Sequence, residues 1–309
     1  MILCCGEALI DMLPSRTAEG RPSFAPYPGG AVFNTAVALG RLGVRAGLLT
    51  GFSTDAFGQM LRDALKDDGV DTTFCVSTDR KTSLAFVALD EGQASYSFHD
   101  EGSAMRMLGI DEIPALPRAV TTLFFGGISL ASDPCARTME ALHERERQDR
   151  VTMLDPNVRP AFANDEAAYR ARLVRMMRVS DIVKVSDEDL DWLFPGKPSL
   201  ERKMQAILDL GPSLAVTTRG SKGATAMSRS GLRVSVPAMP VRVVDTVGAG
   251  DTFNAGFLAR LDALGALEID RFPSVDRDAL YAALAYGVAA ASVAVSRAGA
   301  QPPRLQDLL

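Results

Sequence analysis

Residues 245–251 read Asp-Thr-Val-Gly-Ala-Gly-Asp, and this stretch is the most informative part of the 309-residue chain. Three valines lie in 241–244 before it, and an apolar-periodic segment, 252–264, follows it. The sequence therefore predicts a strand, a glycine turn and a helix. Gly248 and Gly250 allow a tight turn and the close approach of a ligand. Unpaired amides and the dipole at the start of the helix favour an anion there.

Asp251 is unexpected beside an anion site, because its carboxylate repels the charge that the amides of Ala249, Gly250 and Asp251 attract. The conflict disappears if Asp251 accepts a proton from a hydroxyl group while the amides hold a phosphate. The motif therefore indicates phosphoryl transfer. Spacing alone leaves a second interpretation open, in which Asp251 only caps the helix.

Composition limits the class of protein. The chain is long enough, and with 47% hydrophobic residues apolar enough, to form one large α/β domain or a domain with a small appendage. The net charge of −5 argues against a surface for nucleic acid or anionic membrane. Two histidines, His99 and His143, offer little to a zinc site or a Ser-His-Asp triad, and the four cysteines form no CxxC pair.

We expect neither a signal peptide nor a membrane-spanning segment in this sequence. No basic segment precedes the apolar residues 2–5, so a signal peptide is not expected. The apolar run 282–295 is too short for a bilayer and is interrupted by Gly287. We therefore expect a soluble, cytoplasmic protein.

Apolar runs alternate between strand and helix patterns along most of the chain. Predicted strands are Ile2–Cys5, 45–51, 122–125, 151–154, 182–185 and 214–217, followed by a β ribbon of 224–227 and 232–236. Predicted helices are 31–42, 57–68, 134–148, 166–177, 200–210, 252–264 and 280–296. This alternation predicts an α/β fold with a mostly parallel central sheet covered by helices on both faces.

Two segments depart from the alternation. Residues 82–89 and 94–98 alternate apolar and polar positions around the turn sequence Asp90-Glu91-Gly92-Gln93, which indicates a hairpin. We interpret this hairpin, within 81–100, together with 12–28 as a small β lid on a single domain of residues 1–309. An edge extension of the main sheet is the alternative.

Polar residues follow several of the predicted strands. Ligands collect at the carboxyl ends of strands in open α/β sheets, so these residues predict a site. They are Asp11, Asp155, Asn157, Ser186, Thr218 and Asp245.

Three further segments could contact a ligand. Gly29 and Gly30 precede a helix that carries Asn34, whose amide both donates and accepts, as a polyhydroxylated ligand requires. Arg159 is suited to a phosphate or sugar hydroxyl, or to a surface ion pair. Residues 217–223 form a second strand-to-glycine segment without P-loop spacing. No GxGxxG follows the first strand, which disfavours a nicotinamide-dependent oxidoreductase.

Four motifs together resemble one family, the ribokinase-like (PfkB) carbohydrate kinases, and within it the bacterial fructokinases. Residues 245–251 are similar to the C-terminal signature of the family, and 29–43 to its N-terminal signature. GEALIDM at 6–12 and DPNVRP at 155–160 resemble the fructokinases. The resemblance covers essentially the whole chain.

The resemblance implies roles for individual residues. Asp251 would be the catalytic base, and the turn from Gly248 through Ala249 and Gly250 would form the anion hole. Sugar-binding residues would be Asp11, Gly29, Gly30, Asn34, Phe98, Arg159 and Asp251. ATP-binding residues would be Ser186, Thr218, Gly220, Gly223, Gly248 and Gly250. A monovalent cation, usually potassium, would bind at Asp245, Val247, Ala294, Arg297 and Gly299.

Two positions differ from the family pattern. Ser186 and Asp189 replace an asparagine and a glutamate that handle magnesium and phosphate, and their oxygens remain suited to magnesium or its waters. Pro303 replaces a serine that often completes the potassium site. The magnesium role of Asp189 and the requirement for potassium therefore involve positions that differ from the family pattern.

The activity implied is ATP-dependent phosphorylation of the primary hydroxyl of a furanose sugar, with D-fructose as first choice, aided by magnesium and potassium. An ordinary Asp251 would be ionised at pH 7 and ready to act as a base. Alternatives are 2-keto-3-deoxygluconate kinase, ribokinase, a nucleoside kinase, or a sugar-binding regulator without catalysis. The family also implies a homodimer formed through the β lids.

Overall fold

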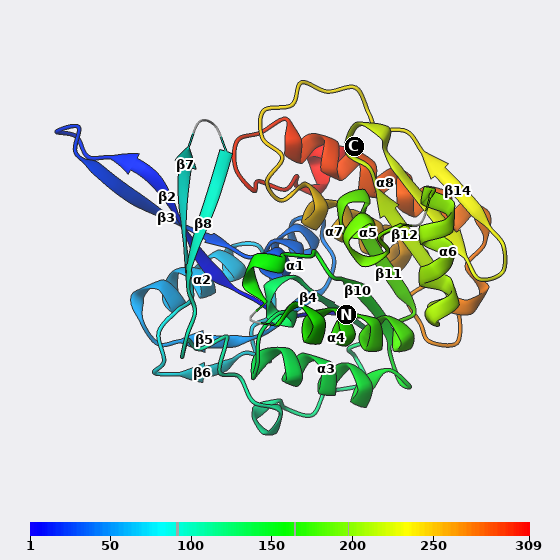
Figure 1. The fold of residues 1–309 in the computed structure, drawn as a ribbon, viewed down its shortest axis with the longest axis horizontal. Helices are drawn as coiled ribbons and strands as arrows, with labels where there is room; N and C mark the ends of the chain where they lie inside the picture. The colour runs from blue at the N-terminus through cyan, green and yellow to red at the C-terminus, as the bar shows by residue number, and fades with distance from the viewer. Residues whose placement is uncertain (91–92, 164, 197) are drawn as a thin grey trace.

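The computed structural model describes residues 1–90, 93–163, 165–196 and 198–309. Its core is an eight-stranded sheet in the order β14-β13-β12-β11-β10-β9-β1-β4 (Figure 1). The pairs from β12 to β4 are parallel, and β13 and β14 add an antiparallel ribbon at one edge. The strands are β1 (Ile2–Cys5), β4 (Ala46–Leu49), β9 (Thr122–Gly126), β10 (Val151–Asp155), β11 (Ile182–Ser186), β12 (Leu214–Thr218), β13 (Ala224–Ser228) and β14 (Arg233–Val236).

Helices cover both faces of this sheet, as its fully buried strands require. Along β1, Ile2 and Cys4 face one core cluster, and Leu3 and Cys5 face the other. The first cluster is closed by α1 (Ala31–Arg41), α2 (Ala56–Asp67), α7 (Ala249–Ala263) and α8 (Arg277–Val295). The second is closed by α3 (Cys135–Glu146), α4 (Glu166–Val179), α5 (Asp187–Leu193) and α6 (Leu200–Leu210). The predicted fold class is confirmed.

Short 3-10 turns connect several of these elements. They are η1 (Ile110–Glu112), η2 (Gly127–Leu130), η3 (Pro160–Phe162), η4 (Gly220–Lys222), η5 (Phe272–Ser274) and η6 (Leu305–Leu308).

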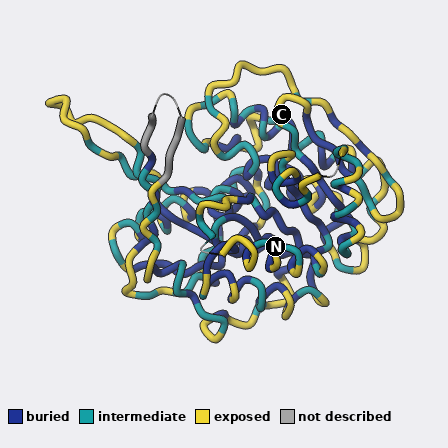
Figure 2. Tube along the Cα trace, viewed as in Figure 1, coloured by how far each residue is buried: buried dark blue, intermediate teal, exposed yellow. Residues whose placement is uncertain are grey.

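A separate four-stranded sheet has the order β3-β2-β7-β8 and projects from the body of the molecule (Figure 1). It consists of β2 (Leu9–Arg16), β3 (Pro22–Gly29), β7 (Leu84–Asp90) and β8 (Gln93–His99). It is not an edge extension of the main sheet, and its β2–β3 tip is exposed (Figure 2). Residues 91–92 of the expected hairpin turn lie outside the described residues.

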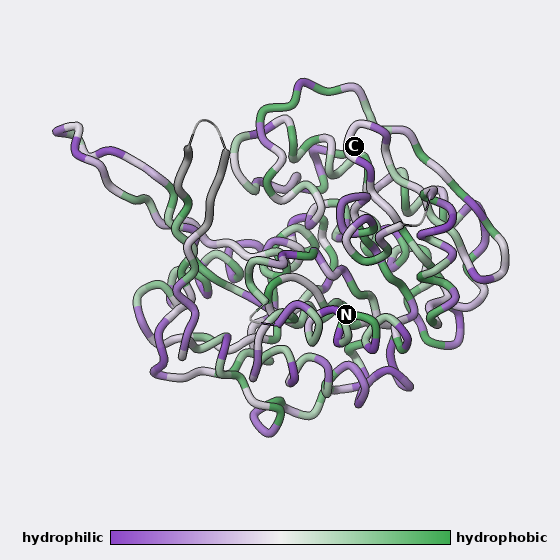
Figure 3. The backbone as a smooth tube through the Cα atoms, viewed as in Figure 1, coloured by the Kyte–Doolittle hydropathy of each residue, from purple (hydrophilic) through white to green (hydrophobic). Residues whose placement is uncertain are grey.

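The strand expected before the glycine motif does not form. Residues 237–248 make an irregular segment in which Val243 and Val244 are 60% and 55% exposed. The sheet ends at β14, and the segment instead crosses the end of α8, where the amide of Val244 donates to the carbonyl of Val295 at 2.8 Å. Figures 2 and 3 show an exposed loop with hydrophobic stretches along the top of the view.

Two other expectations need correction. The predicted strand 45–51 divides at Thr50, because β5 (Gly51–Ser53) leaves the main sheet to pair with β6 (Val76–Thr78). Asp11 lies inside β2 of the smaller sheet rather than at the end of a main-sheet strand, and Asp245 follows no strand. The site therefore combines residues from the main sheet, the small sheet and an irregular loop.

Helix α8 is long and apolar enough to cross a membrane by length and composition alone. Its buried residues, which include Leu280, Leu284 and Val288, belong to the core cluster shared with α7. A core helix passes the same test, and this packing accounts for the apolar composition of α8.

Candidate active site

A cavity of about 510 Å³ lies where β10, β11 and β12 end, between the small sheet and the first turns of α1 and α7. Predicted site residues from distant parts of the chain line this one cavity: Asp11, Gly30, Asn34, Phe98, Arg159, Ser186, Asp189, Thr218, Val247, Gly248, Gly250 and Asp251. The carboxyl ends of the parallel strands lie at the same edge of the sheet. The polar residues that follow them therefore come together in one site, as the sheet topology predicts.

A second cavity, of about 490 Å³, adjoins the first and shares Thr218, Thr246 and Gly250 with it. The predicted nucleotide residues Gly220 and Gly223 line it, and most of its wall is apolar, from Met239, Val241, Val243, Phe253, Val288 and Val295. Two of the three valines that were expected to form a strand, Val241 and Val243, therefore line this cavity. An apolar slot that opens onto a polar cavity suits a nucleotide whose base and phosphates differ in polarity.

The glycine motif forms the first turn of α7. Gly248 has φ of 73°, and a Cβ atom there would lie 2.9 Å from the Cβ of Ala300, so both conformation and space favour glycine. Helix α7 begins at Ala249, three residues before the predicted start. The amide of Ala249 donates to the carbonyl of Thr246 at 3.2 Å. The anion-hole prediction therefore depends mainly on Gly250 and Asp251.

Asp251 joins the two signature motifs. Its side chain is buried, and its Oδ2 atom accepts a hydrogen bond from Nδ2 of Asn34 at 3.0 Å. Desolvation by burial is the main cause that raises the pKa of Asp251 to about 7, and nearby Asp155 acts in the same direction. The expectation of an ordinary pKa is therefore wrong, because the sequence does not reveal how deeply this carboxylate is buried.

Sequence reasoning missed Glu7 as a site residue. Its carboxylate is buried and accepts hydrogen bonds from the amides of Ala31 at 3.0 Å and Ser129 at 3.2 Å. Gly127 lies so close that a Cβ atom there would be 1.8 Å from Oε1 of Glu7. Burial raises the pKa of Glu7. Glu7 therefore fixes the start of α1, which carries Asn34, to the loop after β9.

Lys184 and Asn254 were also missed. Both donate to Oδ2 of Asp155, from Nζ at 2.8 Å and Nδ2 at 2.7 Å respectively, in a buried cluster under the cavity. A lysine inside the apolar strand 182–185 was a usable sequence signal, because an unpaired buried ammonium group is costly. Asn254 gave no such signal, since it lies inside an otherwise ordinary helix.

Asp189 holds the backbone rather than presenting a free carboxylate. Its Oδ1 atom accepts from the amide of Val158 at 2.9 Å, and its Oδ2 atom accepts from the amide of Ser186 at 3.1 Å. The exposed Glu188 lines the same cavity. Among the described residues no group of three or more His, Cys, Asp or Glu could hold a metal ion. Both carboxylate oxygens of Asp189 are thus occupied by backbone amides, which leaves Glu188 as the neighbouring exposed carboxylate for a divalent metal ion.

The expected potassium residues come from two loops that Asp245 holds together. Its Oδ1 atom accepts from the amide of Val247 at 3.0 Å, and its Oδ2 atom accepts from the amide of Gly299 at 2.8 Å. Ala294 lies in the last turn of α8, and Arg297 forms an ion pair with Asp307 at 3.1 Å. The loops therefore lie side by side, as a site built from backbone carbonyls requires.

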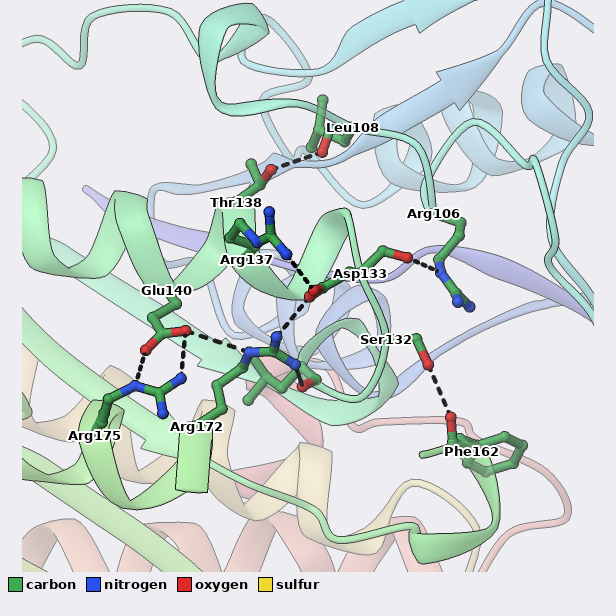
Figure 4. Close-up of polar contacts among 11 residues, drawn as sticks. Arg106, Leu108, Ser132, Asp133, Arg137, Thr138, Glu140, Phe162, Arg172 and Arg175 are labelled. Carbon is green, nitrogen blue, oxygen red and sulfur yellow. Dashed lines mark hydrogen bonds and ion pairs between the residues drawn. The ribbon is translucent and has the colours of Figure 1, made fainter. Parts of the chain in front are cut away.

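Aromatic side chains form one wall of the cavity. Phe98 of β8 contacts Phe162 edge-on, with ring centroids 4.2 Å apart. The carbonyl of Phe162 accepts a hydrogen bond from Ser132 at 2.9 Å, and Arg172 binds the adjacent Asp133 at 2.6 Å (Figure 4). These polar contacts fix the wall to α3 and α4. Gly29, the one sugar-binding prediction that does not line the cavity, ends β3 beside it.

Comparison with known proteins decides the family. The model of the "pfkB family carbohydrate kinase" matches residues 1–307. The chain belongs to this family. A fructokinase of Rhizobium leguminosarum bv. trifolii is 48% identical over 284 residues, which cover 91% of this chain and 85% of the relative.

Solved structures agree with the family. Fructokinase with bound ATP from Xylella fastidiosa is 29% identical with a TM-score of 0.88, covering 99% of this chain and 96% of that one. A double-mutant fructokinase from Vibrio cholerae O395, in a form with fructose, ADP and potassium ion bound, is 27% identical with a TM-score of 0.83 and coverages of 99% and 94%. Membership of this kinase family implies use of ATP and a divalent metal.

Proposed function

We propose that the protein is a fructokinase that transfers the γ-phosphoryl group of ATP to the 6-hydroxyl of D-fructose. The observation that carries this proposal is the position of Asp251, which is buried at the start of α7, bonded to Asn34 and facing a cavity with the apolar slot beside it. The relative that is 48% identical is named a fructokinase, which supports fructose as the sugar.

The sugar would occupy the cavity between the small sheet and Asp251. Asp11 and Asn34 would bind its hydroxyls, and Gly30 leaves room for it beside Glu7. Phe98 would cover the ring, and Arg159 would contact the sugar or the transferred phosphate. Gly29 would shape the turn that presents Gly30.

ATP would place its base in the apolar slot and its phosphates at the first turn of α7. Gly220 and Gly223 would border the nucleotide, with Thr218 and Ser186 closer to the phosphates. Magnesium would neutralise the phosphate charge, and water bound to it would reach Glu188 or Asp189. The amides of Gly250 and Asp251, with Ala249 behind them, would stabilise the oxygens of the transferred group.

In the reaction, Asp251 accepts the proton of the 6-hydroxyl as its oxygen attacks the γ-phosphorus in line. The bond from that phosphorus to the oxygen shared with ADP breaks, and ADP keeps the electron pair. The small sheet would act as a lid that excludes water from this step, because Asp11 and Phe98 on it already border the cavity.

The pH dependence of kcat/KM follows from the raised pKa of Asp251. A base acts only when deprotonated, so kcat/KM will rise with pH up to a midpoint at about 7 and will fall roughly tenfold per pH unit below it. Rates measured between about pH 5 and pH 9 under subsaturating sugar will show this limb. A midpoint near 4, the ordinary value for aspartate, would contradict the assignment.

The position of the new phosphate tests the proposed reaction. Purified protein with MgATP and fructose will release ADP and form fructose 6-phosphate, which two-dimensional proton–phosphorus correlation NMR separates from the 1-phosphate. Formation of the 1-phosphate would place the wrong hydroxyl beside Asp251. Fructose binding without ADP release would favour the sugar-binding regulator.

Potassium would bind between the two loops that Asp245 joins, through oxygens of Val247, Ala294, Arg297 and Gly299, and would order the anion hole without touching substrate. Pro303 is buried and has no hydroxyl to contribute. Turnover in potassium chloride that exceeds turnover in tetramethylammonium chloride supports this site, and equal rates contradict it.

We further propose a cytoplasmic homodimer formed through the small sheets. Phe24 and Tyr27 on β3 are 49% and 53% exposed, and because strand residues three apart lie on opposite faces, each face of the sheet offers one exposed aromatic side chain to such a contact. Prolines at 22, 26 and 28 remove amide donors from β3, an edge strand, so the sheets would pack by their faces rather than pair edge to edge. Sedimentation at micromolar concentration as a monomer would contradict this proposal.

A further inference from the structure

Lys184 is a buried lysine that lines the active-site cavity. Its neighbours on β11, Val183 and Val185, face the core cluster under α3 to α6. Strand alternation therefore directs Lys184 to the opposite face, which α7 covers. Only 5% of its side chain is exposed. An ammonium group in such a place is costly unless neighbouring groups compensate its charge.

Asp155 compensates that charge and fixes the position of the ammonium group. Its Oδ2 atom accepts from Nζ of Lys184 at 2.8 Å and from Nδ2 of Asn254 at 2.7 Å. Its Oδ1 atom accepts from the amide of Asn157 at 3.2 Å. The carboxylate of Asp155 thus accepts three hydrogen bonds. Lys184 uses one of the three N–H donors of its ammonium group in its bond to Asp155.

The ammonium group lies beside the first turn of α7. A Cβ atom on Gly250 would be 3.4 Å from Nζ of Lys184. Gly250 supplies one of the amides expected to hold the phosphoryl group, and Lys184 borders the same cavity as Asp251. A fixed positive charge is therefore placed where negative charge collects during the proposed reaction.

We propose that Lys184 is a catalytic residue whose ammonium group donates a hydrogen bond to the phosphoryl group during its transfer. This inference rests on the proposed kinase function. As the sugar oxygen bonds to the γ-phosphorus, the bond from phosphorus to the ADP oxygen breaks, ADP keeps the electron pair and Asp251 takes the hydroxyl proton. Lys184 stays protonated throughout and stabilises the equatorial oxygens together with the α7 amides. Asp155 and Asn254 are positioning residues for it.

The test compares Lys184→Met with the charge-neutral pair Lys184→Met/Asp155→Asn. The single variant leaves Asp155 buried without its cation and will unfold at a lower temperature. The pair removes both charges, and the unpartnered Oδ1 atom of Asn254 can accept from the new amide, so the pair will recover thermal stability. Both variants will lose kcat by about 100-fold with little change in KM, as expected when a donor to the transition state is removed.

A purely structural role predicts a different result. In that case the pair variant would recover kcat together with stability, and this outcome would overturn the proposal. Lys184→Arg keeps the charge and the ion pair, so its kcat will exceed that of Lys184→Met. Equal kcat in these two folded variants would also overturn it, whether or not the pair variant folds.

The pH profile separates direct contact from an effect through Asp251, whose pKa Lys184 lowers. In the pair variant the opposing effects of Asp155 and Lys184 on the pKa of Asp251 are both removed, so its 100-fold loss will persist at about pH 9, well above that pKa. A loss that disappears at high pH would show that Lys184 acts only through Asp251 and would contradict the proposal.

Lys203→Met is the matched control. Lys203 also forms an ion pair, with Asp191, but it lies on α6 and does not line the cavity. Its kcat will equal that of the wild type. Wild-type turnover on fructose tests the proposed function separately, and its absence would refute that function without depending on any Lys184 variant.

Discussion

Asp251→Asn will lower kcat by about 1,000-fold and will raise the midpoint of thermal unfolding. The loss of rate reflects loss of the general base, which contributes about 10²–10⁴-fold in other enzymes. The gain in stability reflects burial, since the unfolded chain ionises this group near 3.8 but the folded protein holds its pKa at about 7.

The direction of the stability change follows from the linkage between proton binding and folding. A carboxyl group whose pKa is raised on folding binds protons more tightly in the native state, so its contribution to stability is full below about pH 3.8 and is lost as pH rises through about 7. At pH 8 the ionised, buried Asp251 therefore destabilises the protein, by up to roughly 4 kcal/mol. Asparagine removes this charge and can keep the hydrogen bond from Asn34.

Asp262→Asn is the control, because Asp262 lies on the same helix, is exposed and does not line the cavity. Steady-state kinetics and thermal unfolding at pH 6 and pH 8 give the comparison. The stability gain of Asp251→Asn over wild type will be larger at pH 8. An Asp251→Asn protein that is folded, binds fructose and keeps a near-wild-type kcat would refute the role of Asp251 as base.

Glu7→Ala will lower the free energy of unfolding by about 3 kcal/mol, because the buried amide of Ser129 and the half-buried amide of Ala31 lose their acceptor. Glu7→Gln keeps one carbonyl oxygen and will lose less. Because Ala31 begins the helix that carries Asn34, both variants will also raise the KM for sugar. Urea unfolding measures the first effect.

Glu19→Ala is the control for Glu7→Ala, since Glu19 is an exposed carboxylate at the β2–β3 tip. Its urea midpoint will match that of the wild type. If Glu7→Ala unfolds at the wild-type midpoint, the tie between α1 and the loop after β9 contributes little to stability.

Local sequence signals predicted most of the fold because they agree with the packing. The alternation of strands and helices, with Gly turns between them, gave the parallel sheet and both helix layers. The valines at 241–244 misled, because β-branched residues suit a strand and an apolar ligand wall equally well, and only the end of the sheet at β14 distinguishes them.

The candidate site was partly predictable for the same reason. Residues in glycine turns and at strand ends, such as Gly250 and Ser186, carry visible patterns, and the structure brings them to one cavity. Their individual roles remain proposals. Lys184 left a signal, as a lysine in an apolar strand, but the contacts of Glu7 join distant segments, and the pKa of Asp251 depends on burial. Neither can be read from spacing along the chain.

The measurement that tests the central claim most directly is a coupled ADP-release assay with MgATP and potassium across several acceptors. The acceptors are fructose, ribose, 2-keto-3-deoxygluconate, glucose and adenosine. A fructokinase will show kcat/KM for fructose at least tenfold above every other acceptor, which corresponds to about 1.4 kcal/mol in transition-state stabilisation. Higher kcat/KM for another acceptor, or no ADP release with fructose, would contradict the central claim.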